Sequence, residues 1–142
     1  MRRDMHKDDA IARIREDLGR QPGVERVCEA IVEYVASRSA DLLQRVTFGA
    51  LSKAANLDTV TEVLPAVQYL SGSRLPLFET AYTFIDGEEE FDLTDEDIGE
   101  ARRTNVFYHP DLGKPVKDYE SSIYVYFRLT REGLQMCQGS ER

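Results

Sequence analysis

The sequence predicts an α+β fold. Its first half carries apolar residues at helical spacing, and its second half contains two segments in which apolar and polar residues alternate as in half-buried strands. The chain has 142 residues, of which 42% are hydrophobic, so it is long enough to bury a core and too apolar for a disordered protein. We therefore expect a single domain over residues 1–142.

Helical spacing marks two helices at the start of the chain. Ile11, Ile14 and Leu18 predict an amphipathic helix over residues 8–19, and a Gln-Pro-Gly segment ends it. A longer apolar stripe predicts a second helix over residues 25–37. Residues 1–22 are therefore expected to form a helical extension.

Residues 46–71 predict two short helices joined by a turn. Thr47 is suited to cap the first helix, because its hydroxyl can accept a hydrogen bond from the first turn. Asn56 can adopt the left-handed conformation that ends a short helix. Apolar spacings of three and four predict a second helix over residues 59–70, in which Pro65 implies a kink or a late start.

Two strands are predicted far apart in the sequence, over residues 77–85 and 123–129. In the second strand one set of residues is expected to face the core and the other to face outward. The inward set is Ile123, Val125, Phe127 and Leu129, and the outward set is Tyr124, Tyr126 and Arg128. Thr130 is suited to cap a closing helix.

This order of helix, short helix, turn, second helix and strand pair resembles the winged helix-turn-helix superfamily over about residues 25–138. The segment Tyr126-Phe127-Arg128-Leu129-Thr130-Arg131-Glu132-Gly133-Leu134 is similar to the strand-to-helix junction after the wing of bacterial regulators in this superfamily. The resemblance implies a winged-helix core with an extra N-terminal helix and an elaborated wing insert over residues 86–122. It also implies that the helix at 59–70 enters the DNA major groove, and it leaves open a homodimer formed through the N-terminal helix.

The insert is strongly acidic. Residues 75–101 hold ten acidic residues and neither Lys nor Arg, and the net charge of the chain is -8. Because hairpin loops normally span 2–5 residues, this insert is expected to hold structure of its own. Thr94-Asp95-Glu96-Asp97 predicts a capped helix start, and residues 107–114 predict a short strand with a Pro/Gly turn.

This charge argues against DNA, which demands a positive surface. The helix at 59–70 also lacks Lys and Arg. We therefore expect a non-catalytic interaction or regulatory module that binds a protein partner, of basic character, through an acidic and aromatic surface. The candidate contacts for that partner are Glu88, Glu89, Glu90, Asp92, Tyr124 and Tyr126. The alternative is a DNA-binding transcriptional regulator, whose candidate contacts are Arg45, Lys53, Thr59, Thr61, Gln68 and Arg74.

Other chemistry has no sequence signature. His6 and His109 lack paired ligands at zinc spacing, and the acidic cluster does not match the EF-hand spacing. Cys28 and Cys137 are too few for a disulfide framework and predict free thiols in a reducing cytoplasm. No secretory signal and no membrane-spanning run is recognisable. We therefore expect a cytoplasmic protein that is not an enzyme and has no cofactor, metal or membrane partner.

Overall fold

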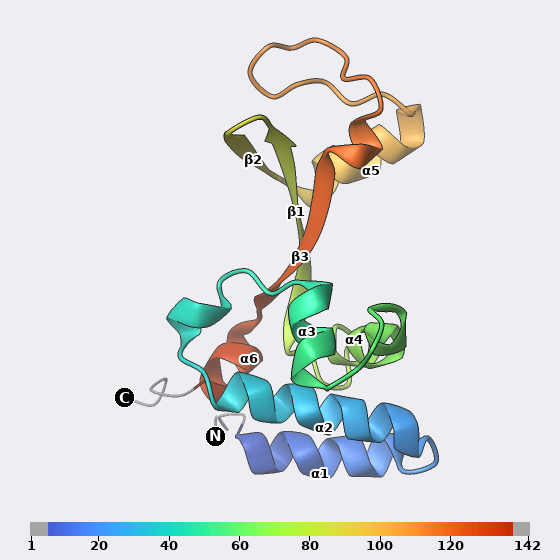
Figure 1. The fold of residues 1–142 in the computed structure, drawn as a ribbon, viewed down its shortest axis with the longest axis vertical. Helices are drawn as coiled ribbons and strands as arrows, with labels where there is room; N and C mark the ends of the chain where they lie inside the picture. The colour runs from blue at the N-terminus through green and yellow to red at the C-terminus, as the bar shows by residue number, and fades with distance from the viewer. Residues whose placement is uncertain (1–5, 138–142) are drawn as a thin grey trace. The chain divides into compact units, whose positions relative to one another are not determined.

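The computed structural model describes residues 6–137, and these form an α+β fold, as predicted (Figure 1). The helices are α1 (Lys7–Leu18), α2 (Pro22–Ala36), α3 (Phe48–Ala54), α4 (Leu64–Leu70), α5 (Asp95–Thr104) and α6 (Arg131–Met136). The strands are β1 (Phe78–Asp86), β2 (Glu89–Leu93) and β3 (Ile123–Leu129), and they form one sheet in the order β2-β1-β3. Single 3-10 turns lie at Ala40–Leu43, Thr61–Val63 and Tyr119–Ser121. Residues 1–5 of the predicted extension, and residue 138 of the resembling segment, lie outside the described residues.

The chain divides into two compact units. The helical unit comprises Met1–Glu79 and Phe127–Arg142, and the insert unit comprises Thr80–Tyr126. Strands β1 and β3 each contribute residues to both units. The predicted insert at 86–122 therefore lies within a unit that has its own core. Across residues 6–137, no helix combines the length and the apolar character needed to cross a membrane.

The core of the helical unit is built on the two N-terminal helices. Ala10, Ile14 and Leu18 line one face of α1 and are buried, as their spacing predicts. Helices α1 and α2 lie side by side in Figure 1 and make the most extensive helix–helix contact. The same core takes in α3, α4, the start of β1 and the end of β3; its largest fully buried side chains include Ile31, Leu51, Leu70, Leu77, Phe78 and Phe127.

The two short helices begin and end where their sequence signals lie. The Thr47 hydroxyl accepts a hydrogen bond from the Ala50 amide at 3.0 Å, and Asn56 has a φ of 58°. Helix α4 begins only at Leu64, after the 3-10 turn, so Pro65 lies in its first turn, where a proline removes no helical hydrogen bond. Of the two alternatives that Pro65 implied, the late start is confirmed.

Strand β2 was missed by the sequence analysis. A two-residue turn, Gly87-Glu88, connects β1 to β2 and pairs Asp86 with Glu89. Gly87 has a φ of 62°, which glycine adopts without steric cost at the first central position of a tight hairpin. The available signal was this Asp-Gly pair followed by the alternation of Phe91 and Leu93 with acidic residues.

Helix α5 covers the small core of the insert unit. Its predicted capping box is confirmed: the Thr94 hydroxyl accepts from the Asp97 amide at 3.0 Å, and the Asp97 carboxylate accepts from the Thr94 amide at 2.9 Å. The buried centre of this core is formed by Phe84, Ala101 and Phe107. The insert therefore folds around local helix signals and a few aromatic residues.

The predicted alternation of burial in β3 is wrong at two positions. Val125 is 36% exposed although it was expected to face the core, and Tyr126 is only 7% exposed although it was expected to face outward. Phe127, the next residue, is buried as predicted. Because β3 contributes to two units, no single face of the strand is buried along its whole length.

Substitution of Gly133 tests the packing of α6 against Leu77, the residue that precedes β1. A Cβ atom at this position would lie 2.4 Å from the Leu77 carbonyl oxygen, a backbone atom that cannot move aside cheaply. We expect Gly133→Ala to destabilise the helical unit by about 1–3 kcal/mol, the usual cost of overpacking. Urea denaturation followed by circular dichroism measures this loss.

Gly99→Ala is the matched control, because Gly99 is an exposed position of α5 and an added Cβ would meet no atom within 4 Å apart from its chain neighbours and the backbone of the helix itself. It is expected to stabilise α5 by up to about 1 kcal/mol through helix propensity. Equal stability of Gly133→Ala and the unsubstituted protein would contradict the packing described here.

Candidate functional site

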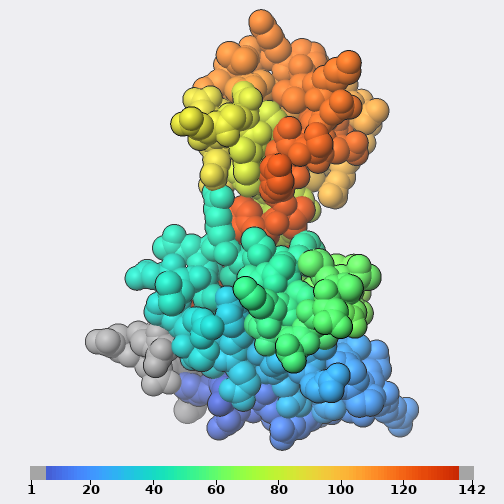
Figure 2. Space-filling view, viewed as in Figure 1, coloured from blue at the N-terminus to red at the C-terminus, as the bar shows by residue number. Residues whose placement is uncertain are grey.

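The β1–β2 hairpin concentrates exposed carboxylates at its turn. Asp86, Glu88, Glu89 and Glu90 are all exposed, and the residues of this hairpin, yellow in Figure 2, lie at the surface of the insert unit. The insert unit carries twelve acidic and four basic residues, a formal charge of -8 that equals the net charge of the whole chain. The net negative charge of the protein therefore comes from this unit.

One face of the sheet gathers four of the predicted protein-contact residues. The register pairs Asp92 with Thr83 and Glu90 with Ile85, so both acidic residues share a face. The Tyr126 hydroxyl lies 3.5 Å from an Asp92 carboxylate oxygen, which places Tyr126 on that face. Tyr124, two residues away along β3, shares it by alternation. We call Glu90, Asp92, Tyr124 and Tyr126 the acidic sheet face.

The two tyrosines of the acidic sheet face have different surroundings. Tyr124 is 52% exposed and presents an aromatic ring that a partner can contact. Tyr126 is buried, which corrects its expected role as an exposed anchor, and its hydroxyl is directed toward Asp92 instead. Tyr124 therefore presents the exposed aromatic ring of this face, whereas Tyr126 is buried within it.

The opposite face of the sheet is closed by packing. The Phe84 ring lies 4.9 Å from the Phe107 ring and 6.0 Å from the Phe91 ring, measured between centroids. Ala101 of α5 packs against the same cluster. Because α5 and these aromatic residues cover this face at Phe84 and Phe91, those two side chains are not available at the surface as Glu90 and Asp92 of the acidic sheet face are.

His109 holds the hairpin against the following loop. Its Nε2 lies 2.9 Å from an Asp86 carboxylate oxygen, while its Nδ1 accepts hydrogen bonds from the amides of Asp111 and Leu112 at 3.1 and 3.2 Å. Since Nδ1 accepts, the proton of the neutral ring is on Nε2 and is donated to Asp86. The sequence predicted a Pro/Gly turn within residues 107–114, and residues 110–112 form a turn directly after His109. The Asp86 partner, 23 residues away, was missed because no local pattern marks it.

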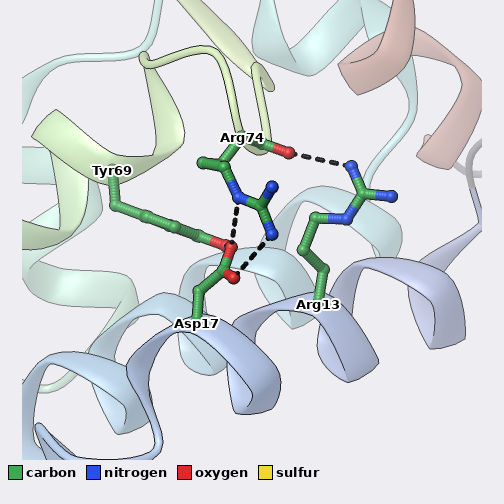
Figure 3. Close-up of polar contacts among 4 residues, drawn as sticks. All are labelled: Arg13, Asp17, Tyr69 and Arg74. Carbon is green, nitrogen blue, oxygen red and sulfur yellow. Dashed lines mark hydrogen bonds and ion pairs between the residues drawn. The ribbon is translucent and has the colours of Figure 1, made fainter.

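A separate polar network joins α1 to the end of α4 (Figure 3). The Arg74 guanidinium donates two hydrogen bonds to the Asp17 carboxylate, at 2.8 and 3.1 Å, and the Tyr69 hydroxyl donates a third at 2.5 Å. Arg13 also donates to the Arg74 carbonyl oxygen at 2.9 Å. Figure 3 shows the Tyr69 and Arg74 side chains converging on Asp17, while Arg13 reaches the Arg74 carbonyl oxygen. The network therefore links α1 to α4 and to the segment that follows it through polar groups that bond one another.

The network shifts the ionisation of its members. The hydrogen bond from Arg74, and then that from Tyr69, lowers the pKa of Asp17 to about 2. Burial, followed by the hydrogen bond to Asp17, raises the pKa of the Tyr69 phenol above its ordinary value. Asp17 is therefore ionised and Tyr69 neutral throughout the physiological range.

The six residues proposed for DNA contact all lie in the helical unit, but their environment is not basic. The Arg74 guanidinium is paired with Asp17, and the Thr59 hydroxyl and amide both donate to the Glu62 carboxylate at 3.1 and 3.2 Å. Asp58 is exposed beside them. Four further candidates are exposed: Arg45, Lys53, Thr61 and Gln68. The turn before α4 therefore carries carboxylates where a DNA-binding surface needs positive charge.

The two thiols are buried and poorly suited to nucleophilic chemistry. Burial raises the pKa of Cys28 to about 12 and also raises the pKa of Cys137. Because the thiolate is the nucleophilic form, neither sulfur is activated at neutral pH. Within residues 6–137, no group of three or more His, Cys, Asp or Glu side chains is placed to hold a metal ion.

Comparisons of the chain with protein-family models, curated proteins and solved structures found no match.

The Asp17 network predicts a pH dependence of stability. An unfolded Asp titrates near pH 3.9, whereas folded Asp17 titrates near 2, so the unfolded chain takes up its proton first as the pH falls. The stabilisation is fully present above about pH 4 and is lost as the pH falls toward 2. We expect Asp17→Asn to lower the urea midpoint at pH 6 and to flatten its dependence on pH between 4 and 2.

Asp8→Asn is the control, because Asp8 is an exposed residue on the same helix. It should keep the pH dependence of the unsubstituted protein. If Asp17→Asn and Asp8→Asn gave the same curve, the network would not carry the predicted stabilisation.

Proposed function

We propose that this protein is a non-catalytic interaction module that binds a basic segment of a protein partner through the β1–β2 hairpin and the acidic sheet face. The observation that carries the proposal is the placement of charge: the exposed Tyr124 shares a sheet face with the exposed Glu90 and Asp92, and Glu88 and Glu89 are exposed at the hairpin turn of the same unit, whose charge is -8. Tyrosine is enriched in protein interfaces, and its ring also attracts Lys and Arg side chains. A basic and extended segment fits this combination.

The proposal includes a winged-helix arrangement for the helical unit. It is supported by the order α2, α3, α4, β1 and β3, and by the antiparallel bridge between Val46 and Phe127 that joins the segment before α3 to β3. In that arrangement the insert unit occupies the place of the wing. A wing that carries a charge of -8 is suited to a basic protein and repelled by phosphate.

The DNA-binding alternative is disfavoured by the same charges. Phosphate contact by Arg74 would compete with its two hydrogen bonds to Asp17, and Asp58 and Glu62 are exposed before α4. Because binding to DNA depends on several neutralised phosphates, such a surface is expected to bind a duplex feebly even at low salt.

Removal of exposed charge tests the proposal. The triple variant Glu88→Gln, Glu89→Gln and Glu90→Gln should weaken the binding of a fluorescent lysine-rich peptide, measured by anisotropy at low salt. Exposed ion pairs contribute about 0.2–1 kcal/mol each, so about 1.5- to 5-fold in affinity is expected for each carboxylate. Added salt should weaken binding to the unsubstituted protein through screening.

The matched control is the triple variant Asp8→Asn, Glu16→Gln and Asp41→Asn, which removes three exposed charges from the helical unit. It should bind the peptide nearly as well as the unsubstituted protein. Equal losses in the two triple variants would show only a net-charge effect. Tight binding of a random-sequence duplex with a steep salt dependence would sink the proposal in favour of DNA.

A further inference from the structure

Strand β3 forms an edge of the sheet, because the strand order is β2-β1-β3. Its backbone directions can be read from two contacts. Phe127 exchanges both of its backbone hydrogen bonds with Val46, at 2.7 and 2.9 Å, so its N–H and C=O point away from β1. At the other end, the Ser122 carbonyl accepts from the Ile85 amide of β1 at 3.0 Å and so points toward β1.

Backbone groups of alternate residues in a strand point to the same edge. Ile123 and Val125 lie an even number of positions from Phe127 along the strand and an odd number from Ser122. Their N–H and C=O groups therefore point to the edge away from β1. Within the described residues, the sheet ends on this side of Ile123 and Val125. An edge of this kind is a template for pairing with another extended chain.

The side chains of the same two residues line a cavity of about 200 Å³ inside the insert unit. Its other lining residues are Tyr82, Ile98, Ala101, Arg102, Tyr119 and Glu120. This volume is below the about 300–1,000 Å³ of pockets that hold a whole small molecule, so it suits a single apolar side chain. Val125, which was predicted to be buried, is exposed at this cavity.

The other face of the sheet presents different chemistry beside the same edge. Tyr124 lies between Ile123 and Val125 in β3 and belongs to the acidic sheet face. A strand added beside β3 would direct alternate side chains to the two faces. Those on one face would meet the cavity, whose lining is mainly apolar, and those on the other would meet the face that carries Tyr124, Glu90 and Asp92.

We propose that the free edge of β3 at Ile123–Val125 accepts an extended segment of a partner protein as an antiparallel fourth strand. In that segment aliphatic residues alternate with Lys or Arg. The backbone edge selects an extended chain, the cavity selects the aliphatic residues, and the charge of the insert unit selects the basic ones. A second copy of this chain fits poorly, because its insert unit would bring the same charge of -8. The inference rests on the proposed function for the basic character of the partner and adds the mode of binding.

The test uses the full chain and the synthetic peptide acetyl-Lys-Val-Lys-Val-Lys-Val-Lys-amide, with two N-methylated forms. Opposite residues of an antiparallel pair place their side chains on the same face, so the valines oppose Ile123 and Val125 and their amides point to β3. N-methylation of the valine amides should remove at least two hydrogen bonds and weaken binding by at least about fivefold. N-methylation of the inner lysine amides, which point to solvent, should have little effect.

Amide hydrogen exchange locates the contact. In the free protein the Ile123 and Val125 amides should exchange rapidly, and the peptide should protect both. Val125→Pro should abolish the binding without breaking the pairing with β1, because the amide that it removes points away from β1. Val125→Thr keeps that amide and is the matched control.

The outcomes separate this inference from the proposed function. A loss with N-methylated valine alone, together with protection of Ile123 and Val125, supports strand addition. Equal binding of all three peptides would overturn it and leave a purely electrostatic contact, so the proposed function would stand alone. Protection of the Ile123 and Val125 amides by dimerisation of the chain, without peptide, would overturn the assignment of the β3 edge to a partner protein. Absence of binding by every peptide at low salt would overturn both proposals.

Discussion

The register of the β1–β2 hairpin is the constraint on which the functional account depends. Gly87 supplies the positive φ that a two-residue turn requires, and the turn pairs Asp86 with Glu89. Successive side chains of a strand point to opposite faces, so a slip of one residue would exchange the faces of β2. The observed register sends Phe91 to the closed core and Glu90 and Asp92 to the acidic sheet face. The same pairing thus places Phe91 and Leu93 on one face and Glu90 and Asp92 on the other.

Each unit has its own means of support. In the helical unit, the charge-assisted hydrogen bonds between Asp17 and Arg74 join elements 57 residues apart, and the buried faces of α1 and α2 supply the apolar core. In the insert unit, Phe84, Phe107 and the His109–Asp86 contact fix the hairpin against α5 and the following loop. The Arg74 guanidinium is hydrogen-bonded to Asp17 within the helical unit. By contrast, the carboxylates of Glu88, Glu89 and Glu90 in the hairpin are exposed. This difference is what favours a basic protein partner over DNA.

The features that sequence predicted well are those set by neighbouring residues. The caps at Thr47 and Thr94, the left-handed Asn56 and the late start of α4 at Pro65 depend on interactions within one turn of helix. Features set by distant residues were missed. No local pattern connects His109 with Asp86, or Arg74 with Asp17, because those pairs form only when the chain has folded. Strand β2 was missed because its first carboxylates continue the acidic stretch of the turn, Glu88-Glu89-Glu90, which obscures the alternation of a strand. The burial of Tyr126 was missed because the alternation of apolar and polar residues in β3 does not reveal that the strand is divided between two units.

The placement of the binding surface is the central claim, and a residue-level map of binding tests it most directly. Backbone amide NMR shifts of the full chain would be recorded in two separate titrations, one with a lysine-rich peptide and one with a random-sequence duplex. The account predicts that the perturbed amides lie at Glu88–Asp92 and around Tyr124, and that they shift with the peptide and remain unmoved by the duplex alone. Perturbations confined to α3 and α4, and produced by the duplex, would contradict it.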